Sequence, residues 1–223
     1  MKALIFLLII SFNILGKDPI SMRRLNQLSG DRSSTVVRRS AWNDRYNKKS
    51  YVYGKAPAKF LAENFDYLKG ESKVLDMGMG EGRNAVFLAQ KGHNVLGVDI
   101  SSVAIKKAKE LSKELGVKIK AVEASLDKYI IQKESLDAII CFYYVDRDLI
   151  KKMKSWLKPG GIIMFEAHNI KERKKKGHQR NPTEYYLKDK ELLTLFGNMK
   201  ILKYEAPLHE SEYRMSIIVK KDD

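Results

Sequence analysis

Three glycines at alternate positions and two aspartates carry the clearest chemical signal in this sequence. The segment from Lys73 to Ala89 reads KVLDMGMGEGRNAVFLA, in which Asp76 is followed by Gly78, Gly80 and Gly82. Glycine allows unusual backbone conformations and lets a ligand approach the main chain closely. Asp99 follows roughly 20 residues beyond the glycines, where an acid is placed to accept hydrogen bonds from both hydroxyls of a ribose. The sequence therefore predicts a site for a cofactor that contains a nucleoside.

The elements around these residues form a strand, a turn, a helix and a second strand. Residues 74–77 are a short apolar strand, and the apolar residues after the glycines recur at helical spacing. Residues 93–100, HNVLGVDI, are typical of a buried strand that ends in Asp99. This order predicts a βαβ unit, in which the start of the helix offers free N–H groups to a ligand.

The spacing discriminates between cofactors. A dinucleotide site of the pattern GxGxxG would need its third glycine at position 83, where the sequence has Arg83. The observed pattern, Asp-x-Gly-x-Gly-x-Gly, resembles motif I of the class I S-adenosylmethionine (SAM)-dependent methyltransferases. In that family the acid lies near the amino-acid part of the cofactor, which carries an ammonium group, whereas a pyrophosphate would be repelled by Asp76.

Further segments resemble one subgroup of this family, the methyltransferases related to tellurite-resistance and thiopurine methyltransferases. These segments are WNDRY at 42–46, YVYGKAP at 51–57, GEGRNAVFLA at 80–89 and LKPGG at 157–161. The similarity runs from roughly Ala41 to the C-terminus. It implies a Rossmann-like α/β fold with a seven-stranded, mostly parallel sheet, an antiparallel C-terminal strand and helices on both faces.

The resemblance also implies which residues contact SAM. We expect contacts from the glycine turn, the following helix start and the ends of the second, third and fourth strands: Asp76, Gly78, Gly80, Gly82, Arg83, Asn84, Asp99, Ile100, Ser125, Leu126 and Phe142. The family usually has an acid at the position of Ser125, where it contacts the adenine amino group. In this sequence either Ser125 or Asp127 would make that contact.

No residue stands out as the catalytic base. Tyr143 follows a predicted strand at 136–142, and Glu166 and His168 lie at the end of a predicted strand at 162–167, so each is a candidate. Arg45 is a further candidate for contacting the substrate, because residues 41–55 cover the cofactor and substrate in the resembling subgroup. A base is needed only if the nucleophile carries a proton at neutral pH. We expect no metal, since the chain has one cysteine and four histidines without ligand spacing.

The 223-residue chain has a formal net charge of +15, which is concentrated in two segments. Residues 1–41 and residues 171–180 each carry a net charge of +5. Such clusters can bind nucleic acid, an anionic membrane or an anionic substrate. We expect a small-molecule methyl acceptor drawn by this charge. RNA or protein methylation and a membrane-tethered SAM-binding module remain alternatives, and the protein would be a monomer or dimer.

The N-terminus divides into two predicted segments ahead of a domain at 41–223. Residues 1–21 include an apolar run that is shorter than the roughly 20 residues of a spanning helix. They would be a short anchor, a signal-like segment or residues upstream of a true start at Met22. Residues 22–40 are basic and lack periodicity, which favours a flexible arm. We expect a cytoplasmic protein, with association to the cytoplasmic face of the inner membrane through residues 1–21 as an option.

The rest of the domain is predicted to alternate helices and strands. Helices are expected at 57–68, 101–115, 146–157 and 187–196, and strands at 117–122, 136–142 and 162–167. Residues 200–206 and 213–220 would be a final antiparallel pair. Residues 158–161, KPGG, would form the turn before the strand at 162–167.

Overall fold

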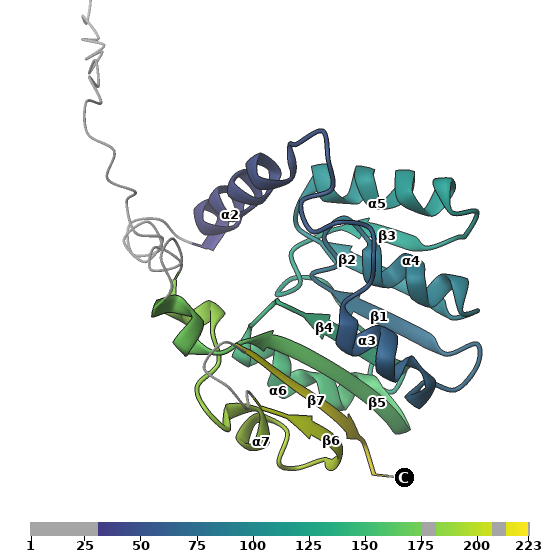
Figure 1. Cartoon of the computed structure of the whole chain (residues 1–223), viewed down its shortest axis with the longest axis vertical. Helices are drawn as coiled ribbons and strands as arrows, with labels where there is room; N and C mark the ends of the chain where they lie inside the picture. Colours follow the sequence, from purple (N-terminus) through teal and green to yellow (C-terminus); the bar gives the residue numbers. More distant parts are fainter. Residues whose placement is uncertain (1–30, 175–181, 207–212, 223) are drawn as a thin grey trace, which may run out of the picture.

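A seven-stranded sheet forms the centre of the computed structural model, which describes residues 31–174, 182–206 and 213–222 (Figure 1). The strand order is β3-β2-β1-β4-β5-β7-β6. All neighbouring strands are parallel except where β7 pairs with β5 and with β6. The strands are β1 (Lys73–Met77), β2 (Asn94–Asp99), β3 (Lys120–Glu123), β4 (Leu136–Phe142), β5 (Leu157–His168), β6 (Lys200–Glu205) and β7 (Arg214–Lys220). The predicted fold class is therefore confirmed.

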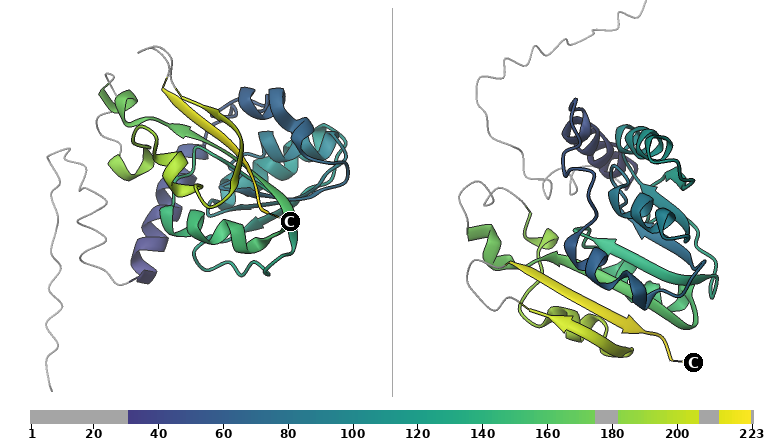
Figure 2. Two further views of the ribbon diagram at one scale, coloured as in Figure 1. Left: turned by 90° about the horizontal axis from the view of Figure 1, so that it is seen from below. Right: turned by 45° about the vertical axis from the view of Figure 1, so that its right-hand side comes forward.

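Helices cover both faces of the sheet, as Figure 2 shows from two further sides. One face carries α3 (Lys59–Asn64), α4 (Arg83–Gln90) and α5 (Ser102–Glu114), and the other carries α6 (Arg147–Trp156) and α7 (Glu191–Leu195). Short 3₁₀ helices lie at Phe65–Tyr67, Ile170–Lys174 and Thr183–Tyr185. Strand β4 is apolar on both faces: Ile139 and Cys141 pack towards α6, and Ala138 and Ile140 pack towards α4. Cys141 is fully buried and is a core residue.

The parallel strands bring their carboxyl ends to one edge of the sheet. Asp76 of β1 lies in register with Gly97 of β2 and with Ile140 of β4, so the residues after these strands are neighbours. In open α/β sheets ligands bind at this edge. Ser101 is the N-cap of α5, because its hydroxyl accepts a hydrogen bond from the Ala104 N–H at 3.1 Å.

The prediction of a flexible arm at 22–40 is wrong for its second part. Helix α2 (Asp31–Tyr46) begins inside it, and Figure 1 shows this helix next to α5. Arg38 and Arg39 of α2 form ion pairs with Asp127 at 3.7 Å and Glu123 at 3.3 Å. These acids follow or end β3, so contacts distant in sequence stabilise a helix that has no apolar stripe of its own. Residues 22–30 lie outside the described residues.

Other element boundaries differ from the predictions in small ways. The third strand is shorter than 117–122 and begins at Lys120, and the predicted turn at 158–161 lies within β5, next to an irregular register with β4. Helix α7 begins at Glu191, not at 187. There Leu187 forms a β-bridge with Asn169, and the Lys188 N–H donates to the Glu191 carboxylate at 2.7 Å.

The predicted apolar segment at 1–21 and most of the basic cluster at 171–180 lie outside the described residues. Within the cluster, Lys171 forms an ion pair with Asp189 at 2.9 Å. None of the described helices combines the length and the apolar character that membrane crossing requires.

Candidate functional site

The turn between β1 and α4 needs glycine for two reasons. Gly80 and Gly82 have positive φ values of 58° and 87°, which other residues rarely adopt. A Cβ atom on Gly80 would lie 2.8 Å from the Tyr46 hydroxyl oxygen, and one on Gly82 would lie 2.7 Å from the Ala108 Cβ. The turn is therefore closely covered by α2 on one side and by α5 on the other.

Asp76 is a buried carboxylate with one unsatisfied oxygen. Its side chain is 2% exposed, and its Oδ2 has no hydrogen-bond partner among the described residues. Burial, and then the nearby charge of Asp99, raises the pKa of Asp76 to about 7, although Arg83 and the Ala85 N–H oppose this. A buried carboxylate oxygen without a hydrogen-bond partner is costly. The site would therefore favour a ligand that brings a cationic hydrogen-bond donor.

Asp99 connects the end of β2 to the glycine turn. Its Oδ2 accepts a hydrogen bond from the Gly80 N–H and its Oδ1 accepts one from the Ser101 N–H, both at 2.8 Å. Burial raises the pKa of Asp99, and these N–H groups lower it in part. Each carboxylate oxygen has two lone pairs, so both can still accept a hydroxyl from a ligand.

Ser125 and Asp127, the two candidates for contacting the adenine amino group, lie together. The Ser125 hydroxyl donates to Asp127 Oδ1, and Asp127 also pairs with Arg38. Leu126 between them is buried. The Ile100 carbonyl, at the same edge of the sheet, accepts a hydrogen bond from Arg39 Nε at 3.3 Å. The two alternatives for this contact thus form one hydrogen-bonded pair.

Residues 47–58, here called the strap, connect α2 to α3 and are attached to the start of α4. Glu81 accepts the Val52 N–H at 2.7 Å and forms an ion pair with Lys107 at 2.7 Å. Asn84 accepts the Ala58 N–H at 2.8 Å. The predicted cofactor residue Asn84 therefore uses its side-chain oxygen to hold the strap. Glu81 was not predicted, although a carboxylate inside a glycine turn was a visible signal.

Arg45 and Tyr46 lie at the end of α2 in an aromatic cluster. The Arg45 Nε donates to the Tyr53 hydroxyl at 2.7 Å, and its guanidinium lies 5.9 Å from the centre of the Trp42 ring. Tyr46 stacks on Trp42 with ring centres 5.7 Å apart. Asn43 of the same helix accepts a hydrogen bond from the Ser101 hydroxyl at 2.7 Å, so α2 also holds the start of α5. The structure brings Tyr46 to the glycine turn and leaves Arg45 exposed.

Tyr143, Glu166 and His168 meet at the ends of β4 and β5. Tyr143 has a positive φ of 62°, its N–H donates to the Glu166 carbonyl at 2.7 Å, and its hydroxyl donates to Glu166 Oε1. The Ser216 hydroxyl donates to Glu166 Oε2 at 2.8 Å. Burial, and then Glu166, raises the pKa of Tyr143 well above that of a free tyrosine. Phe142, just before it, is buried in the core.

Two cations and a histidine surround the Tyr143 ring. The His168 ring lies 4.8 Å from it between centres, and the Arg83 guanidinium lies 5.8 Å from its centre. Arg214 is near enough to lower the pKa of Tyr143, against the dominant effect of burial. The His168 Nδ1 atom lies at ion-pair distance from the Glu172 carboxylate, and the pair is charged when the imidazole is protonated. The candidate catalytic residues are therefore together, but each already has a partner.

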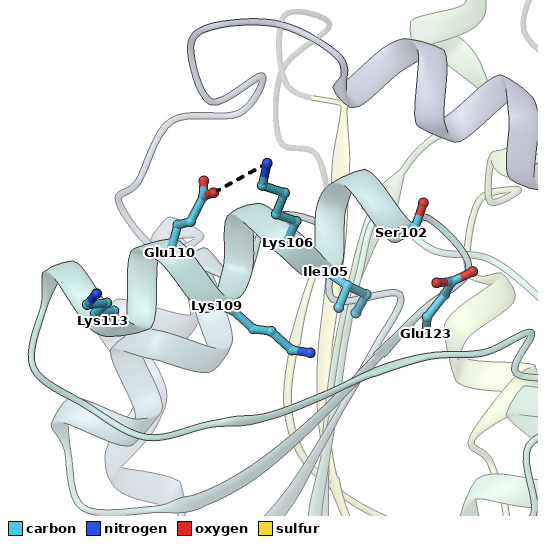
Figure 3. Close-up of a pocket in the computed structure, with 7 residues that line it drawn as sticks. All are labelled: Ser102, Ile105, Lys106, Lys109, Glu110, Lys113 and Glu123. Atoms are coloured by element: carbon cyan, nitrogen blue, oxygen red, sulfur yellow. Dashed lines mark ion pairs between the residues drawn. The ribbon is translucent and has the colours of Figure 1, made fainter.

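Among the hollows on the described surface, one of about 390 Å³ lies between α3 and the adjoining ends of β5 and β7, and its lining includes Glu166, His168 and Arg214. Another, of about 500 Å³, lies along the outer side of α5 (Figure 3). Figure 3 shows its lysines and Ile105, with Lys106 paired to Glu110. None of the predicted site residues lines this second hollow. In the described part of the chain, no three metal-ligating side chains come together.

Comparisons with known proteins agree with this arrangement. Residues 74–161 match a family model described as a methyltransferase domain. The chain is 30% identical over 119 residues to carboxy-S-adenosyl-L-methionine synthase of Nautilia profundicola, which covers 49% of this chain and 50% of that protein. It is 29% identical over 109 residues to tRNA 5-carboxymethoxyuridine methyltransferase of Escherichia coli, which covers 44% and 42%. The chain thus spans about half the length of the curated relatives it matches.

The fold is also that of solved methyltransferases. The crystal structure of TehB from Haemophilus influenzae superposes with a TM-score of 0.62 at 20% identity, covering 82% of this chain and 67% of that one. An identity this low shows a common fold alone. Together, the sheet order and the match to the family model indicate a methyltransferase domain at residues 74–161, within a fold shared with solved methyltransferases.

Proposed function

We propose that this protein transfers a methyl group from SAM to a small-molecule acceptor that is already ionised when it binds. The observation that carries the cofactor part is Asp76, whose buried Oδ2 lacks a partner at the glycine turn. The ammonium group of SAM is a cationic donor of the kind that this oxygen needs. The aspartate and the turn therefore fit the amino-acid end of SAM.

Other predicted cofactor residues would contact the ribose and the adenine of SAM. Asp99 would accept the ribose hydroxyls through its unused lone pairs, while its bonds to Gly80 and Ser101 hold it in place. The pair of Ser125 and Asp127 would receive the adenine amino group. Arg83 and Phe142 would lie at the end nearest the acceptor, beside Tyr143.

SAM supplies an activated methyl group, whose transfer leaves the electron pair of the broken S–CH₃ bond on sulfur and produces S-adenosylhomocysteine. This chain's residues have to hold the nucleophile in line with that bond and exclude water. The candidate bases are poorly suited to removing a proton. Glu166 accepts two hydroxyl donors, His168 is paired with Glu172, and the raised pKa of Tyr143 keeps its phenol neutral. A thiolate, a carboxylate or a metalloid oxyanion would need no base.

The proposed acceptor class agrees with the resemblance to the tellurite-resistance and thiopurine methyltransferases. The second candidate function is RNA methylation. It is favoured by the net charge of +15 and by the similarity to a relative named as a tRNA methyltransferase. A small-molecule acceptor is preferred because the hollow between α3 and the strand ends, lined in part by Glu166 and His168, has the size of a small-ligand pocket.

The test is calorimetric binding of SAM and of NAD to the full chain. We expect SAM to bind at micromolar concentration and NAD not to bind. The variant Asp76→Asn should bind SAM more weakly, because a neutral amide replaces the carboxylate, whereas Asp66→Asn, which changes an exposed aspartate in a 3₁₀ helix, should bind normally. Binding of NAD, or of neither ligand by a folded sample, would contradict the proposal. SAM binding without methyl transfer to any thiol, oxyanion, small acid or RNA would favour a binding module.

A further inference from the structure

The hollow between α3 and the ends of β5 and β7 is connected to the cofactor turn through Tyr143. The Tyr143 hydroxyl donates to Glu166, and its ring lies 4.8 Å from that of His168, and both of these partners line the hollow. Arg83, which directly follows the glycine turn, lies 5.8 Å from the centre of the same ring. A molecule in this hollow would therefore reach the methyl-transfer site beside Tyr143.

Each carboxylate that lines the hollow has a hydrogen-bond or ion-pair partner. Glu63 pairs with Lys59 at 3.6 Å, and Glu205 pairs with Lys203 at 2.9 Å. Glu172 pairs with His168. The buried Glu166 accepts hydroxyl hydrogen bonds at both oxygens.

Arg214 differs from the other basic lining residues because it has no ion-pair partner among the described residues. It lies exposed at the start of β7, in register with His168 of β5. Within the described residues, no carboxylate lies at ion-pair distance from its guanidinium. Arginine presents a planar fork of donors that matches a carboxylate or phosphate-like group. An anion bound there would pair with Arg214 close to Tyr143.

The size and walls of the hollow indicate an organic ligand. Its volume of about 390 Å³ lies in the range of small-molecule sites. Phe60, Ala206 and Tyr213 contribute apolar surface, which an inorganic oxyanion would not cover. We propose that this hollow is the acceptor pocket, and that the acceptor is a small organic anion whose acidic group pairs with Arg214. The inference rests on the proposed function and narrows its substrate class.

The experiment uses three thiols of similar size and different charge: 3-mercaptopropionate, 3-mercaptopropan-1-ol and cysteamine. Each is titrated into the full chain saturated with S-adenosylhomocysteine, and binding is followed by NMR, with the His168 imidazole signals as a local reporter. We expect the anion to bind about tenfold more tightly than the neutral thiol, the effect of one charge-assisted hydrogen bond. It should also shift the His168 signals.

Variants of Arg214 separate this pocket from general attraction to a basic protein. Arg214→Gln should remove the preference for the anion, and Arg214→Lys should keep part of it. The matched control is Lys200→Gln, an exposed cation on β6 that pairs in register with the far end of β7. This control should bind all three thiols like the natural protein. S-adenosylhomocysteine binding should be the same in every variant.

The other outcomes would contradict either the pocket assignment or the proposed function. Equal affinity for the three thiols, a preference for cysteamine, or an anion preference that survives Arg214→Gln would overturn the pocket assignment. So would S-adenosylhomocysteine binding with no thiol binding at all. Failure of the folded protein to bind S-adenosylhomocysteine would instead contradict the proposed function.

Discussion

Asp76 lies one residue before the end of β1, Asp99 ends the neighbouring strand β2, and both carboxyl groups are buried. Burial, followed by the charge of Asp99, raises the pKa of Asp76 to about 7. Asp99 has backbone donors for both oxygens, whereas Asp76 Oδ2 has no partner among the described residues. A cationic hydrogen-bond donor at Asp76 Oδ2 would therefore stabilise the ionised carboxylate.

SAM affinity should increase with pH up to about 7 and level off above it. Below that pH the free protein holds a proton on Asp76, and this proton must leave when the cofactor ammonium pairs with the carboxylate. Below pH 7, the affinity for SAM should rise about tenfold for each pH unit. Calorimetry between pH 6 and neutral pH in two buffers of different ionisation enthalpy would measure both the affinity and the proton released. Asp76→Asn should remove the pH dependence, and a slope that persists in this variant would assign it to another group.

Asp76→Asn should also stabilise the protein without cofactor at pH 8. The folded-state pKa of Asp76 is above its unfolded value, so its contribution to stability is present at low pH and is lost as pH rises through about 7. Asparagine has a similar shape and cannot ionise. We expect a gain of about 1–3 kcal/mol at pH 8 and almost none near pH 4. Urea unfolding at the two pH values would measure it, and a loss of stability at both would show that the carboxylate is satisfied in the free protein.

Asp99→Ala should weaken SAM binding by about 1–3 kcal/mol, because it removes charged hydrogen bonds to the ribose. It should also destabilise the free protein, since the Gly80 and Ser101 N–H groups lose their acceptor. Ser101→Ala is the matched control: it removes the N-cap of α5, at a cost of about 1 kcal/mol, and leaves the ribose acceptor intact. Unchanged SAM affinity in a folded Asp99→Ala variant would refute the ribose assignment.

Glu81→Gln should loosen the strap at 47–58. The pair of Glu81 and Lys107 is largely shielded from water, with side-chain exposures of 3% and 12%, so the remaining lysine would lose its compensation. We expect a stability loss of about 1–3 kcal/mol and faster tryptic cleavage within the strap. Glu110→Gln, which breaks an exposed pair with Lys106 on the same helix as Lys107, should change stability by less than about 0.5 kcal/mol. Similar losses in both variants would mean that the buried pair has no special role.

Tyr143→Phe should reduce kcat for the best acceptor by less than about tenfold and leave its pH profile unchanged, because the neutral phenol is not the base. Removal of a true general base would lower kcat by about 10²–10⁴-fold. The neighbouring Tyr144→Phe, whose hydroxyl lies 3.5 Å from Asp146, controls for loss of a half-buried hydroxyl at this loop. A large fall in kcat for Tyr143→Phe, but not for Tyr144→Phe, would show that Tyr143 acts as the base.

The parts of the site that form within a short stretch of chain could be read from the sequence. The strand, glycine turn and helix at 73–90 are local, and alternation and helical spacing report them directly. The spacing from Asp76 to Asp99 is set by one βαβ unit, so the two acids were predicted to belong to one cofactor site. The strand at 136–142 and the final antiparallel pair followed from the same periodic signals.

Tertiary structure decided what depends on contacts between distant residues. Residues 31–40 are helical where the sequence predicted a flexible arm, and Arg38 and Arg39 in that helix pair with Asp127 and Glu123. Glu166 looked like a free base, yet hydroxyls from β7 and from the loop after β4 occupy both its oxygens. Asn84 is a predicted cofactor contact, and in the structure its side-chain oxygen also holds the strap. Local patterns determine which elements form, whereas the partner of each polar side chain depends on how the sheet and helices bring distant residues together.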